Sequence, residues 1–290
     1  MSDIYAAVTD RIVSQLEAGT PPWVQPWSEI GDPVPTNAVS KKAYRGVNLL
    51  LLSMQQQACG YASNVWMTFR QAQQLGGCVR KGEHGATIVY YDLKTVREND
   101  SEEERRIPLL KLFTVFNTAQ VDGLPQHLQV PATTDPEWRR GELAEEIIKA
   151  SGARIVSGGF RAYFSPVNDR IHLPARAMFT DEPGFYGTLL HELAHWSGHP
   201  ARLNRQFGKR FGDSAYAVEE LVAELAAAFL CAHCRIDGRL QHASYIASWL
   251  EVLRRDKRAL FTAAAQAQRA ADFLIAKASP QEMAALEVAA

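Results

Sequence analysis

The stretch His191-Glu192-Leu193-Ala194-His195 places two histidines four residues apart, with a glutamate directly after the first. On a helix, side chains at i and i+4 project from one face, so both imidazoles can bind one metal ion. Glu192 follows about 100° around the helix axis, beside such an ion rather than on it. A carboxylate in that position can take a proton from an attacking water and pass it to a leaving amine. The stretch therefore predicts a metal site of the zinc type with a general base beside it.

The third metal ligand is predicted on a later helix. A histidine six residues after His195 would be one solution, but position 201 is alanine. The stretch Glu220-Leu-Val-Ala-Glu224 offers the other solution, two carboxylates on one face of an apolar helix. We expect Glu220 to bind the metal and Glu224 to accept the outer ring N–H of a ligand histidine, which fixes its tautomer. Glu219, the third carboxylate of this helix, is expected to face solvent.

Two segments flank the metal motif. Arg170 to Pro174 is predicted to be an edge strand, whose backbone can pair with an extended peptide substrate. A basic group follows the motif, and it has two open interpretations, a binding site for an anionic partner or a solvated loop. Its members are Arg202, Arg205, Lys209 and Arg210.

The first half of the chain contains a window without acidic residues, from position 33 to position 82, although the 31 basic and 32 acidic residues of the whole chain nearly cancel. A locally positive surface attracts phosphate, and unpaired bases stack on exposed aromatic rings. Composition alone fits equally well with core aromatics and solvated basic side chains. The window carries Lys41, Lys42, Arg45, Arg70, Arg80 and Lys81 together with Tyr44, Tyr61, Trp66 and Phe69.

Composition excludes several classes of protein. The 290 residues are 47% hydrophobic and 22% charged, which is ordinary for a globular chain. No apolar run approaches the roughly 18–20 residues that span a bilayer, and no secretory signal precedes the first helix. Four cysteines do not make a disulfide framework. We therefore expect a cytoplasmic protein with no membrane partner.

The predicted fold class is α+β with two domains. Residues 1–125 are expected to form an α+β domain with a small antiparallel sheet, in which strands cover Thr87 to Val96 and Ile107 to Phe116. The proline-containing segment 126–136 is predicted to be a linker. Residues 137–290 are expected to form a mainly helical domain with a short edge-strand sheet.

The order of the motifs resembles that of the ArdC-type antirestriction proteins of conjugative plasmids and integrative elements. The resemblance spans nearly the whole chain and departs from the family pattern in small ways, such as Ser197 where threonine is usual. In the first half it rests on Pro22-Trp23…Pro26-Trp27, Tyr44-Arg45-Gly46-Val47-Asn48, Trp66-Met-Thr, Gly76-Gly77…Lys81-Gly82 and Val115-Phe116-Asn117…Gln120. In the second half it rests on His191-Glu192-Leu-Ala-His195-Trp196-Ser-Gly198-His199, Arg202-Leu203-Asn204-Arg205 and Glu219-Glu220-Leu-Val-Ala-Glu224.

The resemblance implies an N-terminal domain that binds single-stranded DNA, related to the N-terminal part of plasmid TraC-type primases, and a C-terminal zincin-like metallopeptidase domain with Zn²⁺. The role that the resemblance implies for the protein is to protect incoming plasmid DNA from host restriction. Carried over by position, the metal ligands are His191, His195 and Glu220, with Glu192 as general base. The implied DNA contacts lie among Trp23, Trp27, Lys41, Lys42, Tyr44, Arg45, Asn48, Arg80 and Lys81.

Two other functions compete with this hypothesis. One is a metallopeptidase whose N-terminal domain docks protein substrates rather than DNA. The other is a binding module in which the metal is structural, although Glu192 has no ligand role and a structural site would not require it. A protein substrate or a component of a restriction system is a further possible partner.

Overall fold

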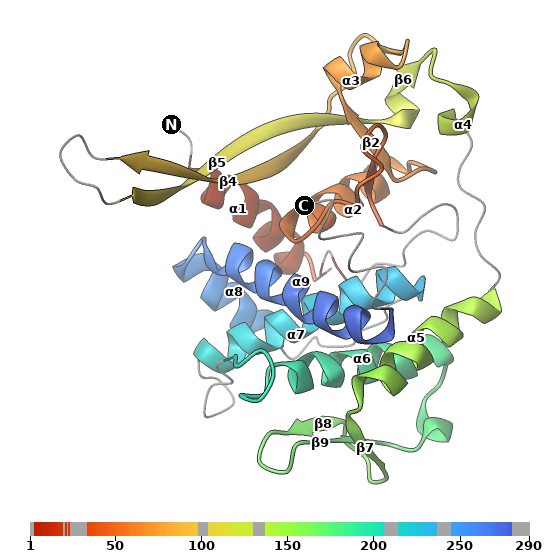
Figure 1. Cartoon of the computed structure of the whole chain (residues 1–290), viewed down its shortest axis with the longest axis vertical. Helices are drawn as coiled ribbons and strands as arrows, with labels where there is room; N and C mark the ends of the chain where they lie inside the picture. The colour runs from red at the N-terminus through yellow and green to blue at the C-terminus, as the bar shows by residue number, and fades with distance from the viewer. Residues whose placement is uncertain are drawn as a thin grey trace.

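The structure is a computed structural model, and it describes residues 3–19, 21, 23, 34–97, 104–129, 137–205, 214–236 and 245–279. The N-terminal part carries the larger sheet and the C-terminal part is mainly helical, so the predicted α+β class is confirmed (Figure 1). Within these ranges, no helix is both long and apolar enough to cross a bilayer.

The N-terminal sheet has the strand order β1-β2-β5-β4. Strands β4 (Ala86–Arg97) and β5 (Glu104–Asn117) form a long antiparallel hairpin, as the sequence predicts. Strand β2 (Val65–Thr68) pairs antiparallel with the base of β5. Strand β1 (Thr36–Asn37) runs parallel to β2, so the sheet is not wholly antiparallel.

Local capping explains where the N-terminal helices begin and end. Helix α1 (Ile4–Glu17) begins after Asp3, whose carboxylate accepts a hydrogen bond from the Tyr5 amide. A capping box formed by Thr68 opens α3 (Phe69–Gln74). Helix α2 (Val47–Cys59) ends at Gly60, whose φ of 65° suits glycine. The remaining elements are β3 (Cys78–Val79), η1 (Thr118–Gln120), β6 (Val121–Asp122) and α4 (Gln126–Gln129).

Helix α7 (Ser214–Cys234) is the centre of the C-terminal part, and every residue from 221 to 232 is buried. Helices α6 (Glu182–Ser197) and α9 (Ala259–Ala278) pack against it. Helices α5 (Glu137–Ser151) and α8 (Ile246–Arg255) flank this group (Figure 1). A charged side chain on a helix that is buried on all sides needs a partner of opposite charge or a metal ion. The carboxylates of α7 therefore require such partners.

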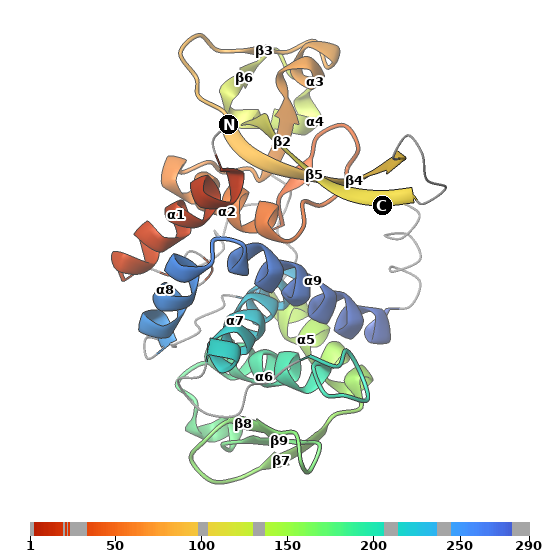
Figure 2. The same ribbon diagram turned by 90° about the vertical axis from the view of Figure 1, so that its left-hand side faces the viewer.

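A three-stranded sheet lies at the far end of the molecule from the N-terminal sheet (Figure 2). Its order is β7 (Arg154–Ser157), β9 (Arg170–Leu173), β8 (Tyr163–Ser165), and η2 (Arg176–Met178) follows. The prediction that 170–174 forms an edge strand is wrong, because β9 pairs with β7 on one side and with β8 on the other. Both hydrogen-bonding edges of β9 are therefore used within the protein.

The N-terminal and C-terminal parts share one hydrophobic core. The apolar side of α1 belongs to the same buried cluster as α7, α8 and α9. Trp23 has no exposed surface and meets Trp249 edge to face, with ring centroids 5.6 Å apart. The division into residues 1–125, 126–136 and 137–290 therefore stays a prediction, and α4 already lies inside the predicted linker.

The substitution Trp23→Ala tests this shared core. We expect it to lower the free energy of unfolding of the full chain by about 3–5 kcal/mol, because it empties a fully buried aromatic position. Urea denaturation measures the loss. Val167→Ala is the control, because Val167 is 92% exposed and its loss should change stability by no more than about 0.5 kcal/mol. Equal effects of the two substitutions would show that Trp23 does not join the two parts.

Candidate functional site

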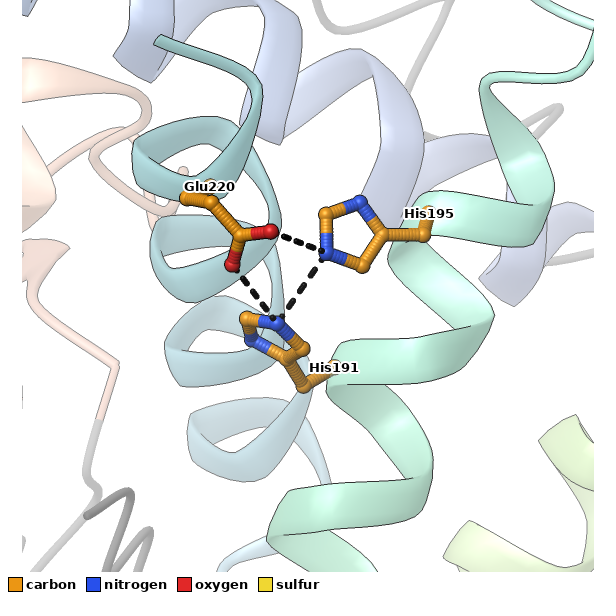
Figure 3. A group of neighbouring side chains, drawn as sticks. All are labelled: His191, His195 and Glu220. Atoms are coloured by element: carbon orange, nitrogen blue, oxygen red, sulfur yellow. Dashed lines mark hydrogen bonds and ion pairs between the residues drawn. The ribbon is translucent and has the colours of Figure 1, made fainter. Parts of the chain in front are cut away.

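Helix α6 holds the two histidines of the motif on one face, one turn apart and buried. Their Nε2 atoms lie 3.1 Å apart (Figure 3). The N-terminus of α6 is capped by Asp181, whose carboxylate accepts a hydrogen bond from the Gly184 amide. The histidines lie in later turns of the same helix. His191 and His195 thus point together toward α7.

Glu220 completes a three-residue cluster from α7. Its Oε2 lies 3.5 Å from His191 Nε2, and its Oε1 lies 3.6 Å from His195 Nε2 (Figure 3). Ligand atoms bound tetrahedrally to one cation at about 2.0–2.2 Å are about 3.3–3.6 Å apart. The three contacts are close to this spacing, and two imidazoles with one carboxylate suit a divalent transition metal. Among the described residues, this is the group that could hold a metal ion.

The outer ring nitrogens of both histidines have carboxylate partners. Glu224 Oε2 lies 3.4 Å from His191 Nδ1, and Glu219 Oε1 lies 3.1 Å from His195 Nδ1. A carboxylate at Nδ1 keeps the proton there and leaves Nε2 with its lone pair toward a metal. The expectation that Glu219 faces solvent is wrong, because its side chain is only 3% exposed.

Arg205 neutralises Glu219 and was not recognised as part of the site from the sequence. Its Nε and Nη2 donate to the two Glu219 carboxylate oxygens at 3.0 and 2.8 Å. The same guanidinium also donates to Ser197 Oγ and to the Ala194 carbonyl. Arg202 instead binds Asp169 and lies over the Trp196 ring. Both arginines are therefore structural, whereas 209 and 210 lie outside the described residues.

Carboxylates shift the pKa of both histidines. Burial by itself lowers the pKa of each imidazole, but hydrogen bonds with the surrounding glutamates outweigh it and raise the pKa of His191 and of His195. The same contacts lower the pKa of Glu220 against the opposing effect of burial. The cluster therefore holds an extra proton at neutral pH in the absence of metal, and a divalent cation displaces that proton when it binds.

Three further side chains surround the cluster. Glu192 is buried on α6 next to the first ligand. The hydroxyls of Tyr216 and Tyr245 lie 3.3 Å apart on the α7 side. Burial, and then hydrogen bonds with Tyr245 and Glu220, raise the pKa of Tyr216, so its hydroxyl stays protonated and can donate to Glu220. Neither tyrosine has a motif that would identify it from the sequence.

Two of the predicted DNA contacts were tryptophans on the proline-rich segment. Trp23 needs correction, because its ring is buried against Trp249 and cannot stack on a base. Trp27 lies outside the described residues. A proline-rich segment is extended, but extension does not determine which side chains it sends into the core.

Four other predicted DNA contacts have partners within the protein. Tyr44 Oη accepts a hydrogen bond from Asn37, and Arg45 forms an ion pair with Asp272. The Asn48 amide binds both the N–H and the carbonyl of Val89. Arg80 pairs with Glu83 and Asp122 and donates to the Ala119 carbonyl. Of the predicted set, Lys41, Lys42 and Lys81 have exposed side chains, and in the described part of the chain these side chains form no hydrogen bond or ion pair.

The exposed aromatic rings of the N-terminal part lie elsewhere, on the β4–β5 hairpin. Tyr90 is 48% and Phe113 44% exposed, and their rings meet edge to face with centroids 5.7 Å apart. Lys111 pairs with Tyr90 across the strands and is exposed beside them. The alternation of residues along the two strands could have identified this face, once the hairpin register was known.

The substitution Glu220→Ala tests the metal cluster, with Glu224→Gln as a graded variant. We expect E220A to abolish stoichiometric binding of Zn²⁺ or Mn²⁺, because it removes one of three ligands. E224Q should weaken binding by roughly 10–100-fold, because it removes the partner of a ligand imidazole. Calorimetric titration of the metal-stripped protein measures both, with Glu251→Gln on the exposed side of α8 as control. Unchanged affinity in E220A would exclude Glu220 as a ligand.

Two family models match the chain. Residues 2–116 match the N-terminal domain of anti-restriction factor ArdC, and residues 142–266 match a zincin-like metallopeptidase domain. The uncharacterized protein y4eC of Sinorhizobium fredii (strain NBRC 101917 / NGR234) is 43% identical, covering 96% of this chain and 93% of that protein. A DNA primase TraC of Escherichia coli is 39% identical, covering 93% of this chain but only 27% of the primase.

Solved structures are also similar over nearly the whole chain. The metal-free crystal structure of the antirestriction protein ArdC from plasmid R388 has a TM-score of 0.82 at 41% identity, covering 96% of this chain and 98% of that one. The Mn(II)-bound structure of the same protein has a TM-score of 0.80, covering 96% and 99%. A divalent metal is thus implied, and it need not be zinc. The chain belongs to the ArdC family of antirestriction proteins.

Proposed function

We propose that this protein shields incoming single-stranded DNA from restriction in the cytoplasm, and that its C-terminal part hydrolyses peptide bonds of a protein partner with the help of a divalent metal. The observation that carries the enzymatic half is the buried cluster of His191, His195 and Glu220 with Glu192 beside it. Membership of the antirestriction family supports the role in DNA protection.

His191, His195 and Glu220 would hold a divalent cation, which would supply Lewis-acid chemistry toward a peptide carbonyl. The role of Glu192 is to accept a proton from the attacking water on its carboxylate and to deliver it to the leaving amine nitrogen. Glu219 and Glu224 keep the ligand imidazoles in one tautomer throughout. The Tyr216 hydroxyl, close to Glu220, remains a donor at this side of the site.

Glu192 separates the enzymatic proposal from a structural metal site. A structural site needs three or four ligands with their supporting partners and has no use for an additional buried carboxyl group. Burying such a group is costly unless it has a role, and Glu192 is only 6% exposed. This position therefore favours catalysis over a purely structural metal.

The substitution Glu192→Gln tests the proposed chemistry. We expect it to retain metal affinity and stability, because it keeps the shape of the side chain, and to lose peptide hydrolysis by at least 100-fold, the low end for general-base catalysis. The measurement is the appearance of new N-termini in a bacterial lysate, labelled and identified by mass spectrometry. The E220A variant and wild type treated with EDTA serve as controls that lack the metal. Identical sets of new N-termini for wild type and E192Q would contradict the role of Glu192.

The DNA-binding half of the proposal uses the β4–β5 surface, which consists of Tyr90, Lys111 and Phe113. Antiparallel partners share one face of a sheet, so the Tyr90–Lys111 pair and Phe113 lie on the same side. Exposed rings provide stacking area for bases, and the ammonium group attracts the phosphates between them. Lys41, Lys42 and Lys81 add positive charge to the same part of the chain.

The double substitution Tyr90→Ala/Phe113→Ala tests this surface. We expect a loss of affinity for single-stranded oligothymidylate of about 5–100-fold, because stacking contributes about 1–3 kcal/mol per base. Fluorescence anisotropy at fixed salt measures it, since affinity depends strongly on salt. Leu112→Ala is the control, because its side chain is 44% exposed but on the opposite face of the strand. Unchanged affinity together with an unchanged number of bound strands in the double variant would exclude the β4–β5 surface as a DNA contact.

A further inference from the structure

The outward face of the small β7-β9-β8 sheet has the composition of a ligand-binding surface. Cross-strand partners show which side chains share it: Arg154 pairs with Arg170, and His172 pairs with Tyr163. The alternate residues, such as Ile171, point the other way and pack into the main core. One face thus supports the fold and the other presents polar and aromatic groups.

This face is positive. Between positions 152 and 180 the chain has four arginines and a single acidic residue, Asp169. Asp169 is already bound by Arg202, and Arg176 is paired with Glu145 and Glu182. Among residues that the structure describes, no ion pair neutralises Arg154, Arg161 or Arg170, so the charge of the face is uncompensated.

The same face carries exposed rings around a cavity of about 450 Å³. Phe160 is 88% exposed, and Tyr163 is stacked on His172 with centroids 4.6 Å apart and ring planes 12° from parallel. Gly159, next to Phe160 in the same loop, has a φ of 72°, a conformation that suits glycine. The lining includes Gly158, Gly159, Phe160, Arg161, Tyr163 and His172.

We propose that this face is a second binding site for single-stranded DNA, in which a base enters the cavity between Phe160 and the Tyr163–His172 stack. Arg154, Arg161 and Arg170 bind the flanking phosphates, because guanidinium groups match phosphate geometry. An acidic peptide would use the arginines but gain little from the rings, so the combination of rings and positive charge favours a nucleic acid.

The second site lies at the opposite end of the molecule from the β4–β5 surface (Figures 1 and 2). The helices α5 to α9 separate the two sheets, so one short strand cannot occupy both. Each chain should therefore bind two short strands independently. The site stands on residues that the proposed β4–β5 surface does not share, so either can fail without the other.

Titration of the full chain with short fluorescent oligothymidylate tests this proposal. The protein concentration is kept well above the dissociation constant, so that the titration measures the number of strands bound per chain. We expect wild type to bind two strands, Phe160→Ala/Tyr163→Ala to bind one, and Tyr90→Ala/Phe113→Ala to bind the other one. Val167→Ala, in the neighbouring turn and away from the cavity, should bind two. Arg161→Ala should reduce the salt dependence of the second site by about one phosphate contact, whereas Arg255→Ala on α8 should not.

Several outcomes would overturn the proposal. Two strands bound by Phe160→Ala/Tyr163→Ala with wild-type affinity would exclude the site. Displacement of the second strand by polyglutamate as readily as by unlabelled oligothymidylate would assign the face to an acidic protein. A single strand bound by wild type and lost in Tyr90→Ala/Phe113→Ala would leave only the β4–β5 surface. Metal content and melting temperature equal to wild type show that a variant is folded.

Discussion

The packing of α6 against α7 depends on the neutralisation of four buried carboxyl groups. Glu192, Glu219, Glu220 and Glu224 lie in an interface that is otherwise apolar, and removing a carboxylate from water is costly unless it is paired. Arg205 pairs with Glu219, and His191 pairs with Glu220 and Glu224. Glu192 lies close enough to His191 to raise its pKa. In the part of the chain that the structure describes, Arg205 supplies the buried guanidinium of this cluster, and protonation of the imidazoles adds further positive charge. A divalent cation between the two helices would displace that proton and neutralise the same carboxylates.

Polar contacts join the N-terminal part to the helices that support this cluster. The Thr9 hydroxyl donates to the Lys257 carbonyl at 2.7 Å, and the Gly46 amide donates to Gln268 Oε1 at 3.0 Å. Arg45 pairs with Asp272 on α9, which itself packs against α7. The position of the sheet is therefore fixed relative to the metal cluster by the shared core and by these contacts. The N-terminal sheet and the metal cluster are therefore joined through one hydrophobic core.

The sequence predicted the contacts that follow from helical spacing. His191 and His195 are one turn apart, and Glu220 and Glu224 are one turn apart, so each pair needs only its own helix to share a face. Glu219 could not be placed in this way, because its burial depends on Arg205, which comes from the segment after α6 rather than from the helix of Glu219 itself. The burial of Trp23 and the central position of β9 likewise depend on which elements pack together in the tertiary structure. Local sequence patterns do not predict those contacts. The exposed pair Tyr90 and Phe113 required the register of the hairpin.

The most direct test of the account is the melting temperature of the metal-stripped protein as a function of added Zn²⁺ or Mn²⁺. A cation that completes the α6–α7 cluster binds the folded state, and at 100 times its dissociation constant it adds about 2.7 kcal/mol of stability. For a chain of this size that corresponds to a rise of roughly 5–10 °C. A saturable rise that E220A abolishes is the predicted result. A melting temperature that does not respond to either metal would contradict the claim that the buried cluster is completed by a cation.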